Sequence, residues 1–352
     1  MKTLLKRLVS VTASALMCIT VLSGCTDVGR VASPVPTEAP ADLSGIYVFI
    51  GKDIQNPYMQ KVYEGFETSC SEIGVASLYK ASEAATPEMQ IEIINELVSR
   101  NVAGIAIAAN DADALEESFK AAMDAGIKVI SLDSAVNASS RQTHIQQADP
   151  EKIGRELINS AYEITGGKGS VVILSSTEQA TNQNLWISYM NKEIAENPEK
   201  YASMPIVSVA YGDDDLMKSK TETQTILQNP DIKVIISPTS VGMMAAGQVL
   251  KETGSDVKLT GLGMPSEMAL YIEEGICPQM YLWNPVDIGY LAGYTIDALV
   301  NGTITGAVGD AFSAGTLGMR TVTDDGVQGS EVMLGDLLKF DKTNILDWKD
   351  EY

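Results

Sequence analysis

Polar and aromatic side chains follow several short apolar runs of this 352-residue chain, at the point where each run ends. Lys52 and Tyr58 follow the first run, Asp133 follows a later one, and Trp283 follows the last. Ten such positions are candidates for binding a small molecule: Lys52, Asn56, Tyr58, Asp133, Asn182, Gln183, Pro238, Ser240, Trp283 and Asn284.

The chemistry of this set suits a small polyol. A carboxylate such as Asp133 can accept hydrogen bonds from two neighbouring hydroxyls, and the amides of Asn182 and Gln183 can both donate and accept. Lys52 adds charge-assisted donors. Aromatic rings such as that of Trp283 can cover the apolar C–H face of a sugar while their polar edges stay satisfied.

Each position taken alone also has a structural explanation. Asn56, Asp111, Asp133 and Thr181 are residue types that cap helices, and Trp283 could belong to a hydrophobic core. Only their joint placement at the ends of apolar runs favours binding, because open α/β sheets bind ligands outside the carboxyl ends of their strands.

Seven short runs rich in Val, Ile and Ala predict strands, with helical patterns between them. Thr86 and Pro87 have the types expected at a helix start, and Gly126 is expected to end the helix that begins after Asp111. Continuous apolar strands are typical of parallel sheets covered on both faces. We therefore predict a doubly wound α/β protein, with a break near residues 146–150 between two lobes and with strands at 46–50, 104–109, 128–132, 170–174, 206–210, 233–236 and 258–261.

The first 25 residues have the form of a bacterial lipoprotein signal. Lys2, Lys6 and Arg7 precede an apolar stretch that ends in the sequence Leu22-Ser23-Gly24-Cys25. The alternative, a buried helix that happens to end in Gly-Cys, has no amphipathic continuation to support it. Prolines at 34, 36 and 40 then predict an extended tether. We expect lipid on Cys25 to anchor the protein to the outer face of the cell membrane.

Composition excludes some functions. Residues 1–24 carry three positive charges and no negative one, so their removal changes the net charge from −21 to −24, and such a surface repels nucleic acid. His144 is the only histidine, which leaves histidine triads and multi-histidine metal sites poorly supplied. Glycoside hydrolysis by a pair among Asp111, Asp133 and Asp213 stays open but is disfavoured. We predict no enzyme activity, cofactor or metal.

Two further cysteines and an acidic run receive no function. Cys70 and Cys277 are expected to be free and buried, with a disulfide as the weaker alternative. The run from Asp213 to Asp215 lacks the spacing, the Gly and the terminal Glu of a calcium loop. It is expected to be a solvated turn that starts a helix.

Several of these segments resemble the rhamnose-binding proteins of ABC transporters and their relatives, the autoinducer-2 receptors, which share the type I periplasmic-binding fold. The similarity extends over nearly the whole chain after the signal and is carried by Ala109–Leu115, Ile130–Ser134, Ala180–Trp186, Ala210–Asp214, Ile236–Gly242, Thr260–Met268 and Leu282–Pro285. The resemblance implies that Lys52, Asp133, Asn182, Gln183, Pro238 and Ser240 line a sugar pocket, with Trp283 and Asn284 contributing from the hinge side.

Three positions depart from the patterns of these groups. Autoinducer-2 receptors typically have Asp where Asn182 stands and Ala where Ser240 stands, whereas Asn182 and the Pro238–Gly242 loop are similar to the rhamnose-binding group. Both groups usually carry Trp in place of Leu132, so one pocket wall is expected to be smaller here. The resemblance favours a rhamnose-like sugar, with autoinducer-2 as the alternative.

The resemblance also implies a domain plan and partners. We expect a signal peptide at 1–24, a lipidated Cys and tether at 25–43, an amino-terminal lobe of 44–147 plus about 286–318, and a carboxy-terminal lobe of 148–285 plus about 319–352. The protein is expected to be a monomer that closes around its ligand and delivers it to a permease with ATP-binding subunits. A membrane sensor kinase is an alternative partner. A transcription regulator of this fold is excluded, because the export signal occupies the place of its basic DNA-binding domain.

Overall fold

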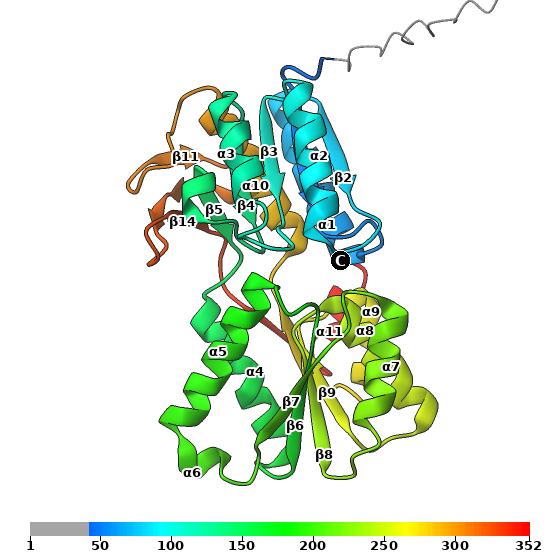
Figure 1. The fold of residues 1–352 in the computed structure, drawn as a ribbon. Coiled ribbons are helices and arrows are strands. Elements are labelled where there is room, and N and C mark those ends of the chain that lie inside the picture. The colour runs from blue at the N-terminus through cyan, green and yellow to red at the C-terminus, as the bar shows by residue number, and fades with distance from the viewer. Residues whose placement is uncertain (1–41) are drawn as a thin grey trace, which may run out of the picture. The chain divides into compact units, whose positions relative to one another are not determined.

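The computed structural model describes residues 42–352, so the predicted signal peptide, Cys25 and nearly all of the tether lie outside the described residues. Two separate, largely parallel sheets form two lobes, which are covered by helices (Figure 1). The fold is therefore the two-lobed α/β architecture predicted from the apolar runs. None of the helices in residues 42–352 has the length and apolar character needed to cross a membrane.

The amino-terminal lobe is built on a seven-stranded sheet in the order β13-β14-β5-β4-β3-β1-β2. All neighbours are parallel except β13 and β14. Its strands are β1 (Tyr47–Gly51), β2 (Ser77–Ala81), β3 (Gly104–Ile107), β4 (Lys128–Leu132), β5 (Thr143–Gln146), β13 (Thr323–Asp324) and β14 (Ser330–Met333). The helical segments of this lobe are α1 (Pro57–Ile73), α2 (Pro87–Ser99), α3 (Glu116–Asp124), η1 (Ala138–Ser140), α10 (Pro285–Val300) and η2 (Gly315–Leu317), and a small hairpin joins β11 (Ala311–Ser313) to β12 (Met319–Thr321).

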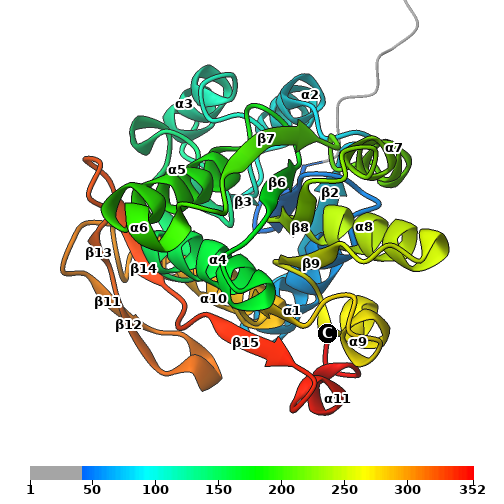
Figure 2. The same ribbon diagram turned by 90° about the horizontal axis from the view of Figure 1, so that it is seen from below.

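The carboxy-terminal lobe is built on a four-stranded parallel sheet in the order β7-β6-β8-β9. Helices α4 and α5 cover one face and α7 and α8 the other, as in a doubly wound sheet (Figure 2). The strands are β6 (Ser170–Ser175), β7 (Ile206–Tyr211), β8 (Ile232–Ser237) and β9 (Lys258–Gly261), and β10 (Gln279–Leu282) pairs with β15 (Leu338–Asp341). The helices are α4 (Pro150–Thr165), α5 (Thr181–Glu196), α6 (Pro198–Tyr201), α7 (Leu216–Ile226), α8 (Ser240–Thr253), α9 (Pro265–Glu273) and α11 (Ile345–Trp348).

The chain passes between the two lobes three times: between β5 and α4, between β10 and α10, and between β14 and β15. The connection between β14 and β15 shows that one predicted lobe boundary is wrong. Residues 319–333 were expected in the carboxy-terminal lobe, yet β14 pairs in parallel with β5 of the first sheet. The reason is long-range pairing: β14 satisfies the edge of β5, and only β15 and α11 continue into the second lobe.

Helices α1 and α10 pack with their backbones in close contact. A Cβ atom added at Gly65 of α1 would lie 1.8 Å from the carbonyl oxygen of Val286, and one at Gly289 of α10 would lie 1.7 Å from that of Val62. No larger residue fits either position. Because α10 begins two residues after Trp283, this packing fixes where that segment leaves the second lobe.

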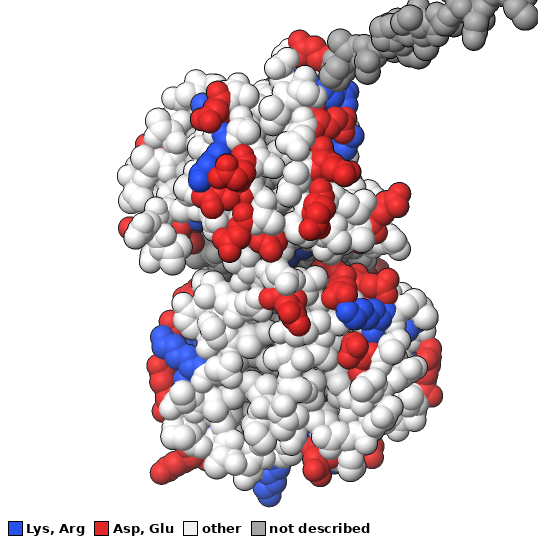
Figure 3. Space-filling model, viewed as in Figure 1, with Lys and Arg blue, Asp and Glu red and all other residues white. Residues whose placement is uncertain are grey.

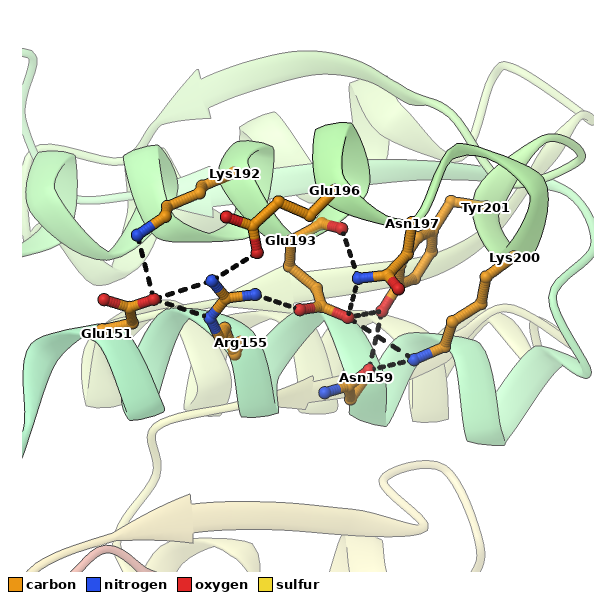
Figure 4. Close-up of polar contacts among 9 residues, drawn as sticks. All are labelled: Glu151, Arg155, Asn159, Lys192, Glu193, Glu196, Asn197, Lys200 and Tyr201. Carbon is orange, nitrogen blue, oxygen red and sulfur yellow. Dashed lines mark hydrogen bonds and ion pairs between the residues drawn. The ribbon is translucent and has the colours of Figure 1, made fainter.

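A network of charged and polar side chains joins α4 to α5 on the surface of the carboxy-terminal lobe (Figure 4). Arg155 of α4 contacts Glu151 at 2.7 Å, Glu196 at 2.6 Å and also Glu193. Lys192 adds a contact to Glu151 at 3.1 Å. The network ties the two helices together.

The surface is acidic, and the two remaining cysteines are internal. On the face shown in Figure 3, Asp and Glu side chains predominate over Lys and Arg on both lobes, and a groove separates the lobes. Cys70 and Cys277 are free and buried, which confirms the expectation for both.

Candidate ligand-binding site

An ion pair lies at the carboxyl ends of β1 and β4. Lys52 directly follows β1 and Asp133 directly follows β4, and the Lys52 Nζ lies 3.3 Å from Asp133 Oδ2 with each side chain only 6% exposed. Asp133 has a φ of +61°, in a tight turn where Leu132 and Ser134 bridge each other. A positive φ is unfavourable for residues other than Gly, although Asp tolerates it best. The turn aims the carboxylate across the groove.

Aromatic side chains from both lobes meet this carboxylate. The Trp283 Nε1–H donates to Tyr58 Oη at 2.7 Å, and the Tyr58 hydroxyl donates to Asp133 Oδ1 at 3.3 Å. The rings of Tyr58 and Trp283 pack edge to face, and Trp186 packs against Trp283 with ring centroids 5.9 Å apart. Burial raises the pKa of Tyr58 well above its ordinary value, and the charge of Asp133 adds to this shift, so Tyr58 stays a donor.

The first turn of α5 supplies two amides from the other lobe. Asn182 Nδ2 donates to Asp133 Oδ2 at 3.1 Å, a direct hydrogen bond between the lobes. Gln183 Oε1 accepts from the Ser175 hydroxyl at 2.6 Å and from the Ser176 amide at 2.8 Å. These bonds fix the Gln183 amide, whose nitrogen donates to no described residue. It is available as a donor to a ligand.

The junction of β8 and α8 closes the cavity from the same lobe, where Pro238, Thr239 and Ser240 lie. About 380 Å³ of space is free of protein atoms here, a volume that includes part of the open groove. It is lined by aromatic and apolar side chains with a few polar groups: Lys52, Asn56, Tyr58, Met59, Asp133, Asn182, Gln183, Trp186, Asp214, Pro238, Thr239, Ser240, Leu262, Leu282 and Trp283. This arrangement can bind a neutral polyol from two sides.

Nine of the ten sequence-predicted binding residues line this one cavity, and Asn284 does not. The Asn284 side chain caps α10 instead: its Oδ1 accepts from the amides of Val286 at 2.9 Å and Asp287 at 3.3 Å. Its acceptor is therefore committed to the helix. Leu132 is fully buried in the core and does not line the cavity.

Six lining residues were absent from the sequence prediction: Met59, Trp186, Asp214, Thr239, Leu262 and Leu282. Trp186 and Asp214 lay within segments that carried the family resemblance, which was the available signal. The acidic run was expected to be a solvated turn and a helix start. Asp215 does cap α7 by accepting from the Lys218 amide at 2.6 Å, and Asp213 pairs with the Lys218 side chain, but Asp214 faces the cavity.

The polar groups considered for catalysis do not gather around the cavity. Asp111 accepts from the backbone amides of Asp113 and Ala114, and neither it nor Asp213 lines the cavity with Asp133. His144 is buried in the first sheet, with Nδ1 2.9 Å from the Ser131 hydroxyl, and burial holds its pKa well below the ordinary value. Within residues 42–352, no cluster of three or more His, Cys, Asp or Glu is arranged to hold a metal ion.

Comparison with known proteins identifies the family. Residues 46–304 match the periplasmic binding protein domain. The crystal structure of an ABC transporter solute binding protein from Clostridium phytofermentas with bound L-rhamnose is 42% identical, with a TM-score of 0.85 over 88% of this chain and all of that one. LsrB from Clostridium saccharobutylicum in complex with AI-2 is 24% identical, with a TM-score of 0.81 over 86% and 99% of the two chains.

A curated relative agrees with these structures. The D-allose-binding periplasmic protein of Escherichia coli is 21% identical over 69% of this chain and 80% of its own length. The chain belongs to the periplasmic binding protein family, among the sugar-binding proteins of ABC transporters with the type I fold.

Proposed function

We propose that this protein is an extracytoplasmic lipoprotein that binds a rhamnose-like monosaccharide between its lobes and delivers it to an ABC permease. The observation that carries this proposal is the 42% identity, over the full length of the relative, to a binding protein with bound L-rhamnose. The cavity chemistry supports it, because Asp133 and two amides face a space walled by Trp186 and Trp283. Aromatic walls with a few polar groups are suited to a deoxy sugar, which has both a methyl group and hydroxyls.

In the proposed mechanism the sugar stabilises the closed arrangement by contacting both lobes. Lys52 and Asp133 contribute from the amino-terminal lobe, and Asn182, Gln183 and Ser240 from the carboxy-terminal one. A ligand shifts such an equilibrium only through contacts that are better in the closed form. The hydrogen bond from Asn182 to Asp133 already joins the lobes. A sugar hydroxyl placed between them would accept from Asn182 and donate to Asp133, so that two hydrogen bonds replace one.

The anchor is a part of the proposal that lies outside the described residues. Lipid on Cys25 would hold the protein at the outer face of the membrane, close to the permease and its ATP-binding subunits. Globomycin treatment, which blocks lipoprotein signal cleavage, should leave an uncleaved precursor, and labelled palmitate should be incorporated into the wild type but not into Cys25→Ser. Equal labelling of the Cys25→Ser variant would contradict lipid attachment at Cys25.

A ligand panel tests the sugar. The protein without residues 1–24 and with Cys25→Ser would be titrated calorimetrically with L-rhamnose, L-fucose, D-ribose and autoinducer-2. We expect L-rhamnose to bind most tightly. A response to autoinducer-2 alone would overturn the ranking, and silence from every ligand would refute the pocket assignment.

An uptake assay tests the partner. Deleting the gene should abolish import of labelled L-rhamnose, and restoring it should recover import. Normal uptake combined with a lost transcriptional response to the sugar would instead indicate a sensor kinase as the partner.

A further inference from the structure

The turn after β7 has an unfavourable backbone that places one carboxylate in the cavity. Asp213 and Asp214 have φ values of +54° and +51°, two consecutive left-handed residues. The turn is held to the neighbouring strand by hydrogen bonds from the Gly212 amide to the Ser175 carbonyl at 2.9 Å and from the Asp213 amide to the Ser176 carbonyl at 2.8 Å. Such conformations cost free energy and persist only where surrounding structure enforces them.

One carboxylate oxygen of Asp214 accepts a hydrogen bond that orients the side chain, and the other oxygen has no donor among the described residues. The Thr239 hydroxyl donates to Asp214 Oδ1 at 2.7 Å, while no described residue donates to Oδ2. Asp214 is one of the cavity-lining residues, and Thr239 lines the cavity beside it. The carboxylate therefore has a fixed direction and an unused acceptor next to the proposed sugar site.

The charge around Asp214 is consistent with a ligand contact. Burial raises its pKa, and Lys52 on the opposite lobe acts against this shift by favouring the carboxylate. Lys52 also pairs with Asp133, so the charge of one ammonium group favours a carboxylate on each lobe. Asp133 of the amino-terminal lobe and Asp214 of the carboxy-terminal lobe therefore both present a carboxylate to the cavity.

We infer that Asp214 is a ligand-binding residue of the carboxy-terminal lobe, whose Oδ2 accepts a hydrogen bond from one specific hydroxyl of the sugar. This inference rests on the proposed function and adds a determinant of specificity to it. Sugars that lack the hydroxyl facing Asp214 leave its Oδ2 without a donor and bind weakly.

The test compares two neighbouring aspartates. Asp214→Asn keeps the side-chain shape, the tolerance of positive φ and an oxygen for the Thr239 bond, but removes the charge. Asp213→Asn makes the same change one residue away, outside the cavity. We expect Asp214→Asn to raise the Kd for L-rhamnose about tenfold or more and Asp213→Asn to change it less than about twofold. The unfolding midpoint of the ligand-free protein should be no lower for Asp214→Asn than for the wild type, because burial disfavours the charged form of Asp214.

Monodeoxy derivatives of L-rhamnose identify the contact. The derivative that lacks the hydroxyl facing Asp214 should have the same Kd in the wild type and in Asp214→Asn, because it has no donor for Oδ2. For the other derivatives the tenfold difference between the two proteins should remain. An equal loss for every derivative, or an unchanged Kd for L-rhamnose, would overturn the inference alone. A wild type that binds no sugar would overturn the proposed function and the inference together.

Discussion

Two ion pairs in the amino-terminal lobe are equally buried but differ in where their unused donors lie. Lys52 and Asp133 are each 6% exposed, and Arg141 and Asp325 are 4% and 5% exposed with Nη2 and Oδ2 2.5 Å apart. Asp325 also accepts from the amides of Val327 and Gly329, at 2.9 and 2.8 Å. Asp325 thus accepts three hydrogen bonds, the same number of polar contacts as Asp133 makes.

Each pair keeps an unused donor: Arg141 Nε is buried without a partner, whereas the Lys52 side chain lines the cavity. Lys52 Nζ has Asp133 as its one partner among the described residues, although an ammonium group can donate three hydrogen bonds. Arg141 and Asp325 hold the segment before β14 to the loop before β5, 184 residues away in sequence. Burial alone therefore does not separate a structural pair from a binding pair, whereas unused donors at a cavity do.

Breaking the structural pair should have the largest effect. Arg141→Ala leaves Asp325 buried without its cation, which typically costs about 3–5 kcal/mol of folding free energy. Denaturant unfolding should show this loss, while the Kd for L-rhamnose of the folded protein stays within about twofold. Replacing both partners, as in Arg141→Met with Asp325→Leu, should be less destabilising than Arg141→Ala. An equal or larger loss of folding free energy in the double variant would show that the ion pair itself stabilises the fold, beyond offsetting the cost of burying two charges.

Breaking the proposed binding pair should also weaken ligand binding. Asp133→Ala removes a charged acceptor for the sugar and should weaken binding about 100-fold or more, equivalent to about 3 kcal/mol. The unfolding free energy should fall as well, because Lys52 is only 6% exposed and loses its counterion. Calorimetric titration and denaturant unfolding of the same preparation separate the two quantities. Unchanged affinity for L-rhamnose would remove Asp133 from the binding site.

The sequence predicted the apolar strands well and several polar strands poorly. β4 was predicted with its observed ends and β6 within one residue of them, because each is a short apolar run. β2 is half-buried along its whole length, and β5 reads Thr-His-Ile-Gln, so neither has an apolar run to detect. β14 depends on a partner strand far away in the chain, which local periodicity does not encode.

The candidate site could be anticipated where topology alone places a residue. Lys52 and Asp133 follow strands, and the carboxyl ends of parallel strands meet at one edge. Whether Asn284 caps a helix or faces the cavity depends on side-chain rotation, which its type does not reveal. Asp214 was hidden because a run of three aspartates is typical of a solvated turn, and its positive φ is visible only in the fold.

A third carboxyl group, that of Glu267, can be compared with those of the two ion pairs, because it is half-buried and has no cationic partner among the described residues. Glu267 of α9 is half-buried, its Oε2 accepts no hydrogen bond from a described residue, and burial raises its pKa from 4.5 to about 7. The folded protein keeps this proton up to about pH 7, whereas the unfolded chain releases it near pH 4.5. The free energy of unfolding therefore falls as pH rises through this window, and the loss is complete above it.

Glu267→Gln should remove that pH dependence. We expect the variant to be more stable than the wild type by about 1–2 kcal/mol at pH 8, a value reduced for partial exposure, and equally stable at pH 4. Urea unfolding at the two pH values measures the difference. A gain of the same size at both would show that packing, and not ionisation, is responsible.

Removing the hydroxyl that touches the binding pair should have a smaller effect. Tyr58→Phe leaves Trp283 Nε1 without its acceptor and Asp133 Oδ1 without a donor, so the carboxylate is less well oriented. The Kd for L-rhamnose should rise about threefold to tenfold. Ser131→Ala is the matched control, since Ser131 accepts from Arg141 in the structural pair at 3.1 Å and should leave the Kd unchanged. A larger rise in Ser131→Ala than in Tyr58→Phe would reverse the assignment of the two pairs.

The exposed network between α4 and α5 should have the smallest effect, and salt should divide it into two parts (Figure 4). The Glu151 side chain is 37% exposed, so Glu151→Gln should cost about 0.5 kcal/mol or less in dilute buffer and nothing in 1 M NaCl, which screens exposed charges. Glu193 is 7% exposed and also accepts from the Tyr201 hydroxyl at 3.2 Å. Glu193→Gln should therefore cost more, and that cost should persist in 1 M NaCl, because water and ions reach this carboxylate poorly. Equal loss of both effects in salt would contradict this division. It would mean that ions screen Glu193 as well, because they reach its partner Arg155, which is 23% exposed.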